Sequence, residues 1–311
     1  MDYATEIQQL IGRTPVLELT HSTIPNNCRI FAKLEFFNPG GSVKDRLGVA
    51  LIADAEKRGE LKPGGTIVEP TAGNTGIGLA IAAIGKGYQL KLVVPQKFSM
   101  EKQTLMRALG AEVINTPTAD GIKGAIQKAE EIARQEGAFM PAQFSNAANP
   151  ETYIQTLGPE LWDQLDGAID VFVAGAGSGG TFMGTSQFLK AQNQAIKTVI
   201  VEPEGSILNG GESGPHKTEG IGMELLPPFM DTQYFDAIHT ITDREAFDAV
   251  RQLAQNEGLL VGSSSGAAFV AALREAQTAK PGSHIVTVFA DSSERYLSQD
   301  IYGAFLEEEQ Q

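Results

Sequence analysis

The stretch TIVEPTAGNTGIGLAIAAIGK, residues 66–86, contains the unit from which the chain is built. Residues 66–69 are mostly apolar and include β-branched side chains, which is typical of a buried strand. A polar loop with glycine follows, and apolar residues from 76 to 86 indicate a helix. A strand, a loop and a helix in this order predict a βα unit, with its loop at the carboxyl end of the strand.

The same alternation extends along most of the chain. Further strands are expected at residues 30–36, 91–95, 112–115, 171–174, 199–202 and 285–289. Further helices are expected at residues 43–58, 100–109, 122–135, 151–165, 181–190, 244–256 and 267–279. Strands that alternate with helices predict an α/β fold, in which helices cover both faces of mainly parallel sheets. Residues 205–228 are rich in Gly and Pro and interrupt this pattern, which indicates either a functional loop or a flexible surface loop.

Composition excludes several classes of function. The chain has 311 residues, is 42% hydrophobic and carries a formal net charge of −14, which argues against binding to nucleic acid or a membrane surface. Cys28 is the only cysteine and the four histidines are scattered, so we expect no disulfide within the chain and no metal site. Because no transmembrane segment or signal peptide is visible, the default expectation is a cytoplasmic protein.

One lysine stands at an unusual place. The stretch GGSVKDRLG, residues 40–48, predicts a helix start, and Lys44 lies in the first turn, where the positive helix end disfavours a cation. Helix propensity alone favours a solvated lysine. The functional alternative is a Schiff-base lysine, because an amine removed from water near a positive helix end has a lowered pKa. The motif in isolation leaves both interpretations open.

Three further loops offer groups for binding. EPTAGNTGIG (69–78) presents backbone N–H groups, hydroxyls and an amide at a helix start, which suits a carboxylate or phosphate better than an ordinary cap does. AGAGSGGT (174–181) matches the dinucleotide pattern G-x-G-x-x-G, and Glu202 stands where a ribose-binding acid is expected, but the loop equally predicts a cup for one phosphate. VGSSSGAA (261–268) has three serines before a helix, although capping needs only one. An amine, a carboxylate-binding loop, a phosphate cup and a serine cluster suit pyridoxal phosphate better than NAD.

The ordered motifs of the chain resemble those of the cysteine synthase and cystathionine β-synthase family of pyridoxal-phosphate enzymes. The resemblance covers nearly the whole chain. In order, the motifs are IGRTPVL (11–17), KLEFFNPGGSVKDR (33–46), EPTAGNTGIGLA (69–80), QFSNAANP (143–150), GAGSGGT (175–181), EGIG (219–222), GLLVGSSSGAA (258–268) and DSSERYLS (291–298). The resemblance implies fold type II, similar to the tryptophan synthase β-subunit, and a homodimer. It also implies a smaller mobile domain at residues 35–145, a larger one at 1–34 and 146–311, and the cofactor in the cleft between them.

The resemblance also implies a role for each site residue. Lys44 is the catalytic residue, which binds the cofactor covalently and then moves the α-proton of the substrate. The other cofactor-binding residues are Asn74 at the phenolic oxygen, Gly177, Ser178, Gly179, Gly180 and Thr181 at the phosphate, and Ser264 at the pyridine nitrogen. The substrate carboxylate is held by Thr71, Gly73, Thr75 and Gln143. Ala72 of the same loop is also a substrate-binding residue, although cysteine synthases more usually have Ser there.

The implied reaction replaces the leaving group at Cβ of O-acetylserine or serine by a thiol. The motifs EFFN, TAGNTG and HKTEGIG favour homocysteine as the thiol, in the manner of bacterial O-acetylserine-dependent cystathionine β-synthases, because the Glu219 carboxylate can accept a hydrogen bond from the homocysteine ammonium. On residue type alone, Glu219 is a solvated loop acid. The alternatives are a cysteine synthase that uses sulfide, a nicotinamide oxidoreductase, and a binding module without activity.

Overall fold

The computed structural model describes residues 3–71 and 73–306, and the chain divides into two compact units. The smaller unit comprises residues up to Ile11 together with Asn38–Asn149, and the larger unit comprises Gly12–Phe37 and the residues from Pro150 onward. The expected division placed residues 1–34 in the larger domain. The N-terminal residues group with the smaller unit because the Gln8 side chain donates to the backbone oxygens of Ile81 and Ile84, each at 3.0 Å. The mobility of the smaller domain stays a prediction.

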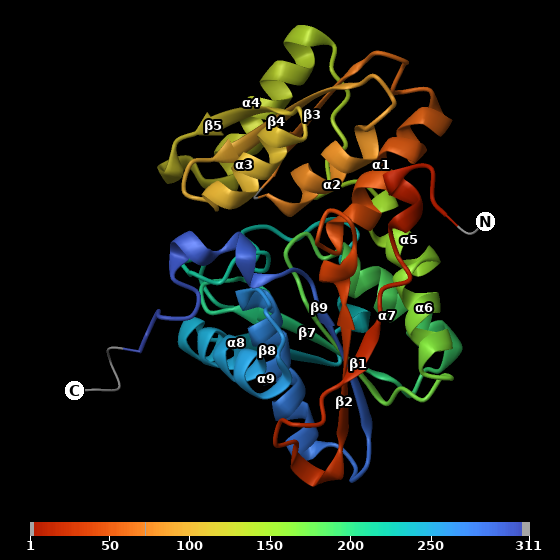
Figure 1. Cartoon of the computed structure of the whole chain (residues 1–311), viewed down its shortest axis with the longest axis vertical. Helices are drawn as coiled ribbons and strands as arrows, with labels where there is room; N and C mark the ends of the chain where they lie inside the picture. The colour runs from red at the N-terminus through yellow and green to blue at the C-terminus, as the bar shows by residue number, and fades with distance from the viewer. Residues whose placement is uncertain (1–2, 72, 307–311) are drawn as a thin grey trace. The chain divides into compact units, whose positions relative to one another are not determined.

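The smaller unit is built on a parallel sheet with helices on both faces (Figure 1). Its strands are β3 (Thr66–Pro70), β4 (Gln89–Pro95) and β5 (Glu112–Thr116), in that order, and its helices are α1 (Lys44–Arg58), α2 (Asn74–Ala83), α3 (Met100–Ala108) and α4 (Gly121–Glu136). Alternate strand residues point to opposite faces. Ile67 and Leu92 pack in the core shared with α1, α2 and α3, whereas Val68 and Val93 pack against Ala129 of α4.

The larger unit has a second, mixed sheet. Its strands are β1 (Val16–Glu18), β2 (Arg29–Leu34), β9 (His284–Phe289), β6 (Val171–Gly175), β7 (Lys197–Pro203) and β8 (Ala237–Ile241), in spatial order. Only β1 pairs antiparallel with its neighbour. The helices of this unit are α6 (Leu157–Gln164), α7 (Gly180–Gln192), α8 (Asp243–Glu257) and α9 (Ser263–Thr278), while α5 (Ala148–Gln155) begins at the end of the smaller unit. The expected α/β architecture with mainly parallel sheets is confirmed.

Two strands and one helix break were absent from the expected pattern. β1 is only three residues long, and β8 is largely half-buried, so neither shows a clear apolar run. The helix expected at residues 151–165 is two helices, α5 and α6. Pro159 in the first turn of α6 has no amide hydrogen to donate to the Gln155 oxygen, so a single helix cannot continue through this point.

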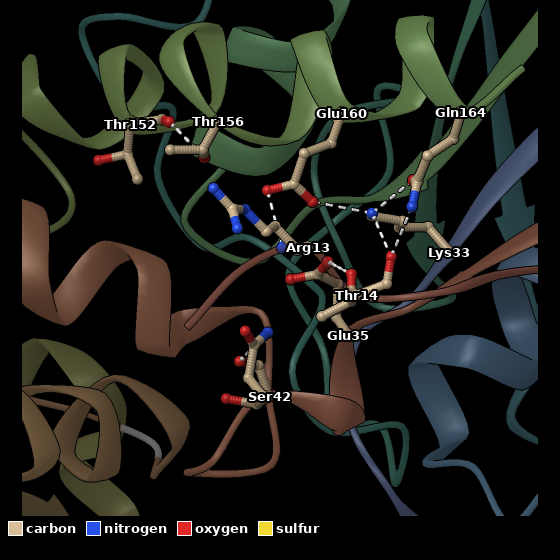
Figure 2. Close-up of polar contacts among 10 residues, drawn as sticks. Arg13, Thr14, Lys33, Glu35, Ser42, Thr152, Thr156, Glu160 and Gln164 are labelled. Carbon is tan, nitrogen blue, oxygen red and sulfur yellow. Dashed lines mark hydrogen bonds and ion pairs between the residues drawn. The ribbon is translucent and has the colours of Figure 1, made fainter. Parts of the chain in front are cut away.

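A buried lysine holds the first residues of the larger unit (Figure 2). Lys33 of β2 is fully buried, and its Nζ donates to the Thr14 backbone oxygen at 2.7 Å, to Glu160 Oε2 at 2.8 Å and to Gln164 Oε1 at 2.7 Å. An ammonium has three donors, so these three acceptors compensate it well for the loss of water. The network joins the segment before β1 to β2 and α6.

In the smaller unit, the backbones of α1 and α2 are in direct contact. A Cβ on Gly48 would lie 2.3 Å from the Gly78 backbone oxygen, and a Cβ on Gly78 would lie 2.4 Å from the Lys44 backbone oxygen. Neither position has room for a side chain, so the two helix backbones touch. This contact places the first residue of α1 directly against α2.

We predict that Gly48→Ala destabilises the chain, although alanine is the better helix former. Overpacking of this kind costs about 1–3 kcal/mol, which exceeds the gain in helix propensity. Chemical denaturation measures the change, with Ala53→Gly at an exposed position of the same helix as the control. The control loses only about 0.5–1 kcal/mol. An unchanged or increased stability of Gly48→Ala would contradict the backbone contact.

Candidate active site

Lys44 is the first residue of α1 and follows a tight turn. The Asp45 carboxylate is fully buried and accepts a hydrogen bond from the Gly40 amide at 2.5 Å, while Ser42 Oγ accepts one from the Lys44 amide at 3.2 Å. A Cβ on Gly40 would lie 2.4 Å from Asp45 Oδ1, so this position requires glycine. The turn therefore fixes the backbone from which the Lys44 side chain projects.

The Lys44 amine is not an ordinary solvated amine. Removal from water lowers its pKa from 10.5 to about 8. At pH 7.5 a pKa of about 8 leaves roughly a quarter of the amine neutral, compared with about 0.1% for an ordinary lysine. Only the neutral amine is nucleophilic, so the environment of Lys44 favours attack on an aldehyde.

The loop before α2 is folded around one threonine. Thr71 Oγ1 accepts hydrogen bonds from the amides of Gly73 at 2.9 Å and Gly76 at 3.3 Å. Gly73 has a φ of 141°, and a Cβ there would lie 2.3 Å from Cδ of the buried Lys102. Ala72 lies outside the described residues. α2 begins at Asn74, earlier than expected, so the polar residues Asn74 and Thr75 form its first turn.

Gln143 is distant in sequence but joins this loop. Thr75 Oγ1 donates to Gln143 Oε1 at 2.7 Å, across 68 residues of sequence. Thr71, Thr75 and Gln143 are all buried. The structure therefore brings together, within the smaller unit, the described residues that the sequence predicts at the substrate carboxylate.

Glu69 has a contact that the sequence analysis missed. Its side chain is fully buried at the end of β3, and it accepts hydrogen bonds from the amides of Ala142 at 2.8 Å and Gln143 at 2.9 Å. Burial raises the pKa of Glu69 to about 8, although the two amides act in the opposite direction. The sequence feature that could have indicated this contact is an acidic residue at the end of an otherwise largely apolar strand.

The glycine-rich loop of the larger unit leads into α7. A Cβ on Gly177 would lie 2.3 Å from the Gly220 oxygen, and Gly179 has a φ of 84° and contacts Met230 closely. The first amides of a helix lack partners inside the helix and point toward an anion. Gly180 and Thr181 begin α7, and Ser178 and Thr181 are buried beside this helix start. The loop thus fits one phosphate group.

The three serines of α9 have different surroundings. Ser263 Oγ accepts from the Glu219 amide and Ser265 Oγ accepts from the Ala290 amide, both at 3.1 Å. Ser264 Oγ makes no hydrogen bond with any residue in the described part of the chain. The N-cap, Gly262, has no side-chain cap, so capping explains none of the three serines. Ser264 is therefore the serine whose hydroxyl can serve a ligand.

Glu219 is not a solvated loop acid. Its side chain is 8% exposed, and Gln299 Nε2 donates to its Oε1 at 2.5 Å. The simple expectation from residue type is wrong because the C-terminal 3-10 turn at Leu297–Gln299 covers the carboxylate. Gln299 was absent from the sequence analysis, since nothing local indicates a contact across 80 residues.

The Glu202 carboxylate, on which a dinucleotide site would depend, already accepts hydrogen bonds from the protein itself. Its carboxylate is buried and accepts from the amides of Leu208 at 2.8 Å and Asn209 at 3.0 Å, and from Thr240 Oγ1 at 3.1 Å. These bonds leave it poorly placed to bind a ribose. The nicotinamide alternative therefore loses its acidic residue.

Comparison with known proteins identifies the family. The model of the family described as pyridoxal-phosphate-dependent enzyme matches residues 7–291. The chain belongs to this family. It is 58% identical over 303 residues to a protein of Bacillus subtilis named O-acetylserine-dependent cystathionine β-synthase. This match covers 97% of this chain and 99% of that protein. It is also 55% identical over 301 residues to a protein of Helicobacter pylori named cysteine synthase, with coverage of 96% and 98%.

Solved structures agree with this assignment. An O-acetylserine-dependent cystathionine β-synthase from Helicobacter pylori has a TM-score of 0.95 and 55% identity, and the match covers 97% of this chain and all of that one. A hydrogen sulfide-producing enzyme from Fusobacterium nucleatum has a TM-score of 0.92 and 41% identity, over 94% of this chain and all of that one. The predicted family, the fold type and the dependence on pyridoxal phosphate are confirmed.

Within residues 3–71 and 73–306, no helix is both long and apolar enough to cross a membrane.

We predict that Lys44 in the cofactor-free protein reacts with acetic anhydride with a midpoint near pH 8. Labelling at a series of pH values, followed by peptide mass spectrometry, measures the midpoint, and the exposed Lys57 of the same helix is the reference. Because the folded pKa lies below the ordinary value, Lys44 also makes stability rise between pH 8 and about 10.5. The same pH dependence at Lys44 and Lys57 would contradict the lowered pKa.

Proposed function

We propose that the chain catalyses β-replacement on O-acetylserine or serine, with homocysteine as the acceptor, and that it forms cystathionine. The observation that carries the proposal is the packing of α1 on α2. It holds the half-buried Lys44 beside the helix whose first turn and preceding loop carry Thr71, Gly73 and Thr75. An activated amine and a carboxylate-binding loop on one rigid pair of helices suit chemistry at the α-carbon of an amino acid.

The residues of the chain have separate tasks in this reaction. When bound, pyridoxal phosphate supplies an electron sink for the charge that develops at Cα of the substrate. Lys44 Nζ would hold the cofactor in the resting enzyme, and its amine, once released by the incoming substrate, would take the proton from Cα of the substrate. The acetate would leave from Cβ with the bonding electron pair, the thiol would release its proton to solvent as its sulfur bonds to Cβ, and Lys44 would return to Cα the proton that it took.

The binding roles follow the same proposal. Thr71, Gly73, Thr75 and Gln143 bind the substrate carboxylate, and Asn74 binds the phenolic oxygen of the cofactor. The amides and hydroxyls of Gly177, Ser178, Gly179, Gly180 and Thr181 bind its phosphate. Ser264 would bind the ring nitrogen. This role is supported by its hydroxyl, which makes no hydrogen bond with any described residue. A neutral serine at this nitrogen makes the ring a weaker electron sink than a carboxylate would, and this favours prompt β-elimination.

Glu219 supports homocysteine as the acceptor. The carboxylate is buried and oriented by Gln299, so a contact with an ammonium group is worth more than at an exposed site. A carboxylate offers about four acceptor positions, so the bond from Gln299 can coexist with one from an ammonium. Sulfide has no ammonium group and gains nothing from this acid.

A cysteine synthase that uses sulfide is the second candidate. It is favoured by the Helicobacter pylori relative that is named cysteine synthase, whereas the solved Helicobacter pylori structure at the same identity is described as a cystathionine β-synthase. The names of relatives thus divide on the acceptor, and kinetics must decide. The homodimer and the cytoplasmic location stay predictions.

We predict that Lys44→Ala lowers β-replacement by about 1,000-fold or more, because the variant lacks the base that moves the α-proton. Lys57→Ala, in the same helix, should keep its activity. Borohydride reduction of the wild-type holoenzyme, followed by peptide mapping, should find the pyridoxyl group on Lys44. A label on another lysine would refute the assignment.

We predict that Glu219→Gln lowers kcat/KM for homocysteine by about 10-fold, since a neutral amide loses the charge of the hydrogen bond to the ammonium. The reaction with sulfide should change by less than about 2-fold. Paired kinetics with both acceptors measure the effect, and Glu224→Gln removes the same charge from an exposed position nearby as the control. Wild-type enzyme that ignores homocysteine would make the chain a cysteine synthase, and equal slowing with both acceptors would give Glu219 another role.

A further inference from the structure

We propose that Glu69 is a positioning residue, which orients Gln143 toward the substrate carboxylate by holding the amides of Ala142 and Gln143. The inference rests on the proposed function, in which Gln143 binds that carboxylate. Glu69 itself contacts no substrate in this scheme. Glu69 acts through the backbone of the Gln143 turn, whose amides donate hydrogen bonds to its carboxyl group near the end of β3.

The turn that carries Gln143 has an unfavourable backbone. Ala142 has a φ of 54°, which lies in the left-handed region that a residue with a Cβ seldom adopts. The amides of Ser145 and Asn146 both donate to the Ala142 oxygen at 2.9 Å and close the turn on one side. The two bonds to Glu69 hold the other side. Such a conformation persists only where the surroundings over-determine it.

The Gln143 side chain is held by Thr75 and by Pro70, the residue after Glu69. Its Oε1 accepts from Thr75 Oγ1 at 2.7 Å, and its Nε2 donates to the Pro70 oxygen at 3.2 Å. A side-chain amide carries two N–H groups. The second N–H is donated to no residue in the described part of the chain, and the side chain is only 4% exposed. A buried donor in this state is suited to a carboxylate ligand.

The larger unit contains the same arrangement without a site. Glu202 precedes Pro203, the last residue of β7, just as Glu69 precedes Pro70, the last residue of β3. Its carboxylate also accepts from two consecutive amides, those of Leu208 and Asn209, and in addition from Thr240 Oγ1. The loop that Glu202 holds carries none of the proposed site residues. Glu202 therefore supplies a matched control for the loss of a buried acid that binds a loop.

Substitution of Glu69 by glutamine tests its two hydrogen bonds to the backbone while keeping the shape of the side chain. Whether neutral or ionised, the Glu69 carboxyl group has two oxygens that can accept. In Glu69→Gln one oxygen becomes an amide NH₂, which opposes one of the two backbone N–H groups. The shape is kept, but the turn loses one of its two restraints. Glu69→Asp keeps both acceptors and withdraws them by one methylene.

The test measures ligand binding to the holoenzyme through the absorbance of its cofactor. The probes are L-alanine, an amino acid without a leaving group, and ethylamine, which has an amine but no carboxylate. We expect Glu69→Gln to raise the Kd for L-alanine by about 10-fold and the Kd for ethylamine by less than about 2-fold. Gln143→Ala should have the same selectivity, and the double variant should be no worse than Gln143→Ala alone.

Each outcome decides between the possibilities. Glu202→Gln should lower the unfolding temperature without changing the ratio of the two Kd values. Equal weakening of both probes by Glu69→Gln, or additive effects in the double variant, would overturn the positioning role. If Gln143→Ala is selective and Glu69→Gln is not, this inference fails while the proposed function stands. If Gln143→Ala leaves both Kd values unchanged, the proposed role of Gln143 fails and the inference falls with it. If Glu69→Gln does not fold, Glu69→Asp decides by the same ratio.

Discussion

The contact of the α1 and α2 backbones is the constraint on which the proposed chemistry depends. Because Gly48 and Gly78 have no side chains, the two helices approach so closely that the Lys44 backbone oxygen lies against α2. The first turn of each helix carries a reactive or binding group, and the crossing holds these turns in a fixed relation. A catalytic amine must be positioned to within a fraction of an ångström relative to its substrate. A packed pair of helices provides this precision better than a mobile loop does.

Buried ionisable side chains in this chain hold backbone segments together through hydrogen bonds. Lys33 and Glu69 each contact backbone atoms of a segment that is distant in sequence, and Glu202 contacts the amides of the loop that follows its own strand. A buried charged group without partners is costly, so each such residue specifies the position of the segment that satisfies it. At Glu69 this requirement reaches the Gln143 turn and, through Thr75, the first turn of α2. The structural and the functional uses of a buried acid are therefore difficult to separate without a control such as Glu202.

Close backbone approach explains the glycine-rich loops of both units. Gly73 faces the Lys102 side chain, Gly177 faces the Gly220 backbone, and Gly179 has a left-handed φ. A side chain at any of these positions would displace its neighbour. The glycines thus allow loops to lie tightly at helix starts, where unpaired amides are directed at anions. The same physical need produces the G-x-G-x-x-G pattern whether the ligand is a dinucleotide or a single phosphate.

Local sequence was sufficient for the βα units, the glycine loops and the family, because periodicity and turn residues act over a few positions. It placed strands β3, β5 and β6 within one residue of their observed ends, and it singled out Lys44 by a cation in an unfavourable first turn. Only the tertiary structure decided which polar groups are used. It gave Ser263, Ser265 and Glu202 hydrogen-bond partners within the protein, and it gave the Ser264 hydroxyl none among the described residues. It also covered Glu219 with Gln299 and joined Glu69 to Gln143. These choices depend on hydrogen bonds between residues far apart in the chain, and burial, which makes such bonds obligatory, exists only after the chain has folded.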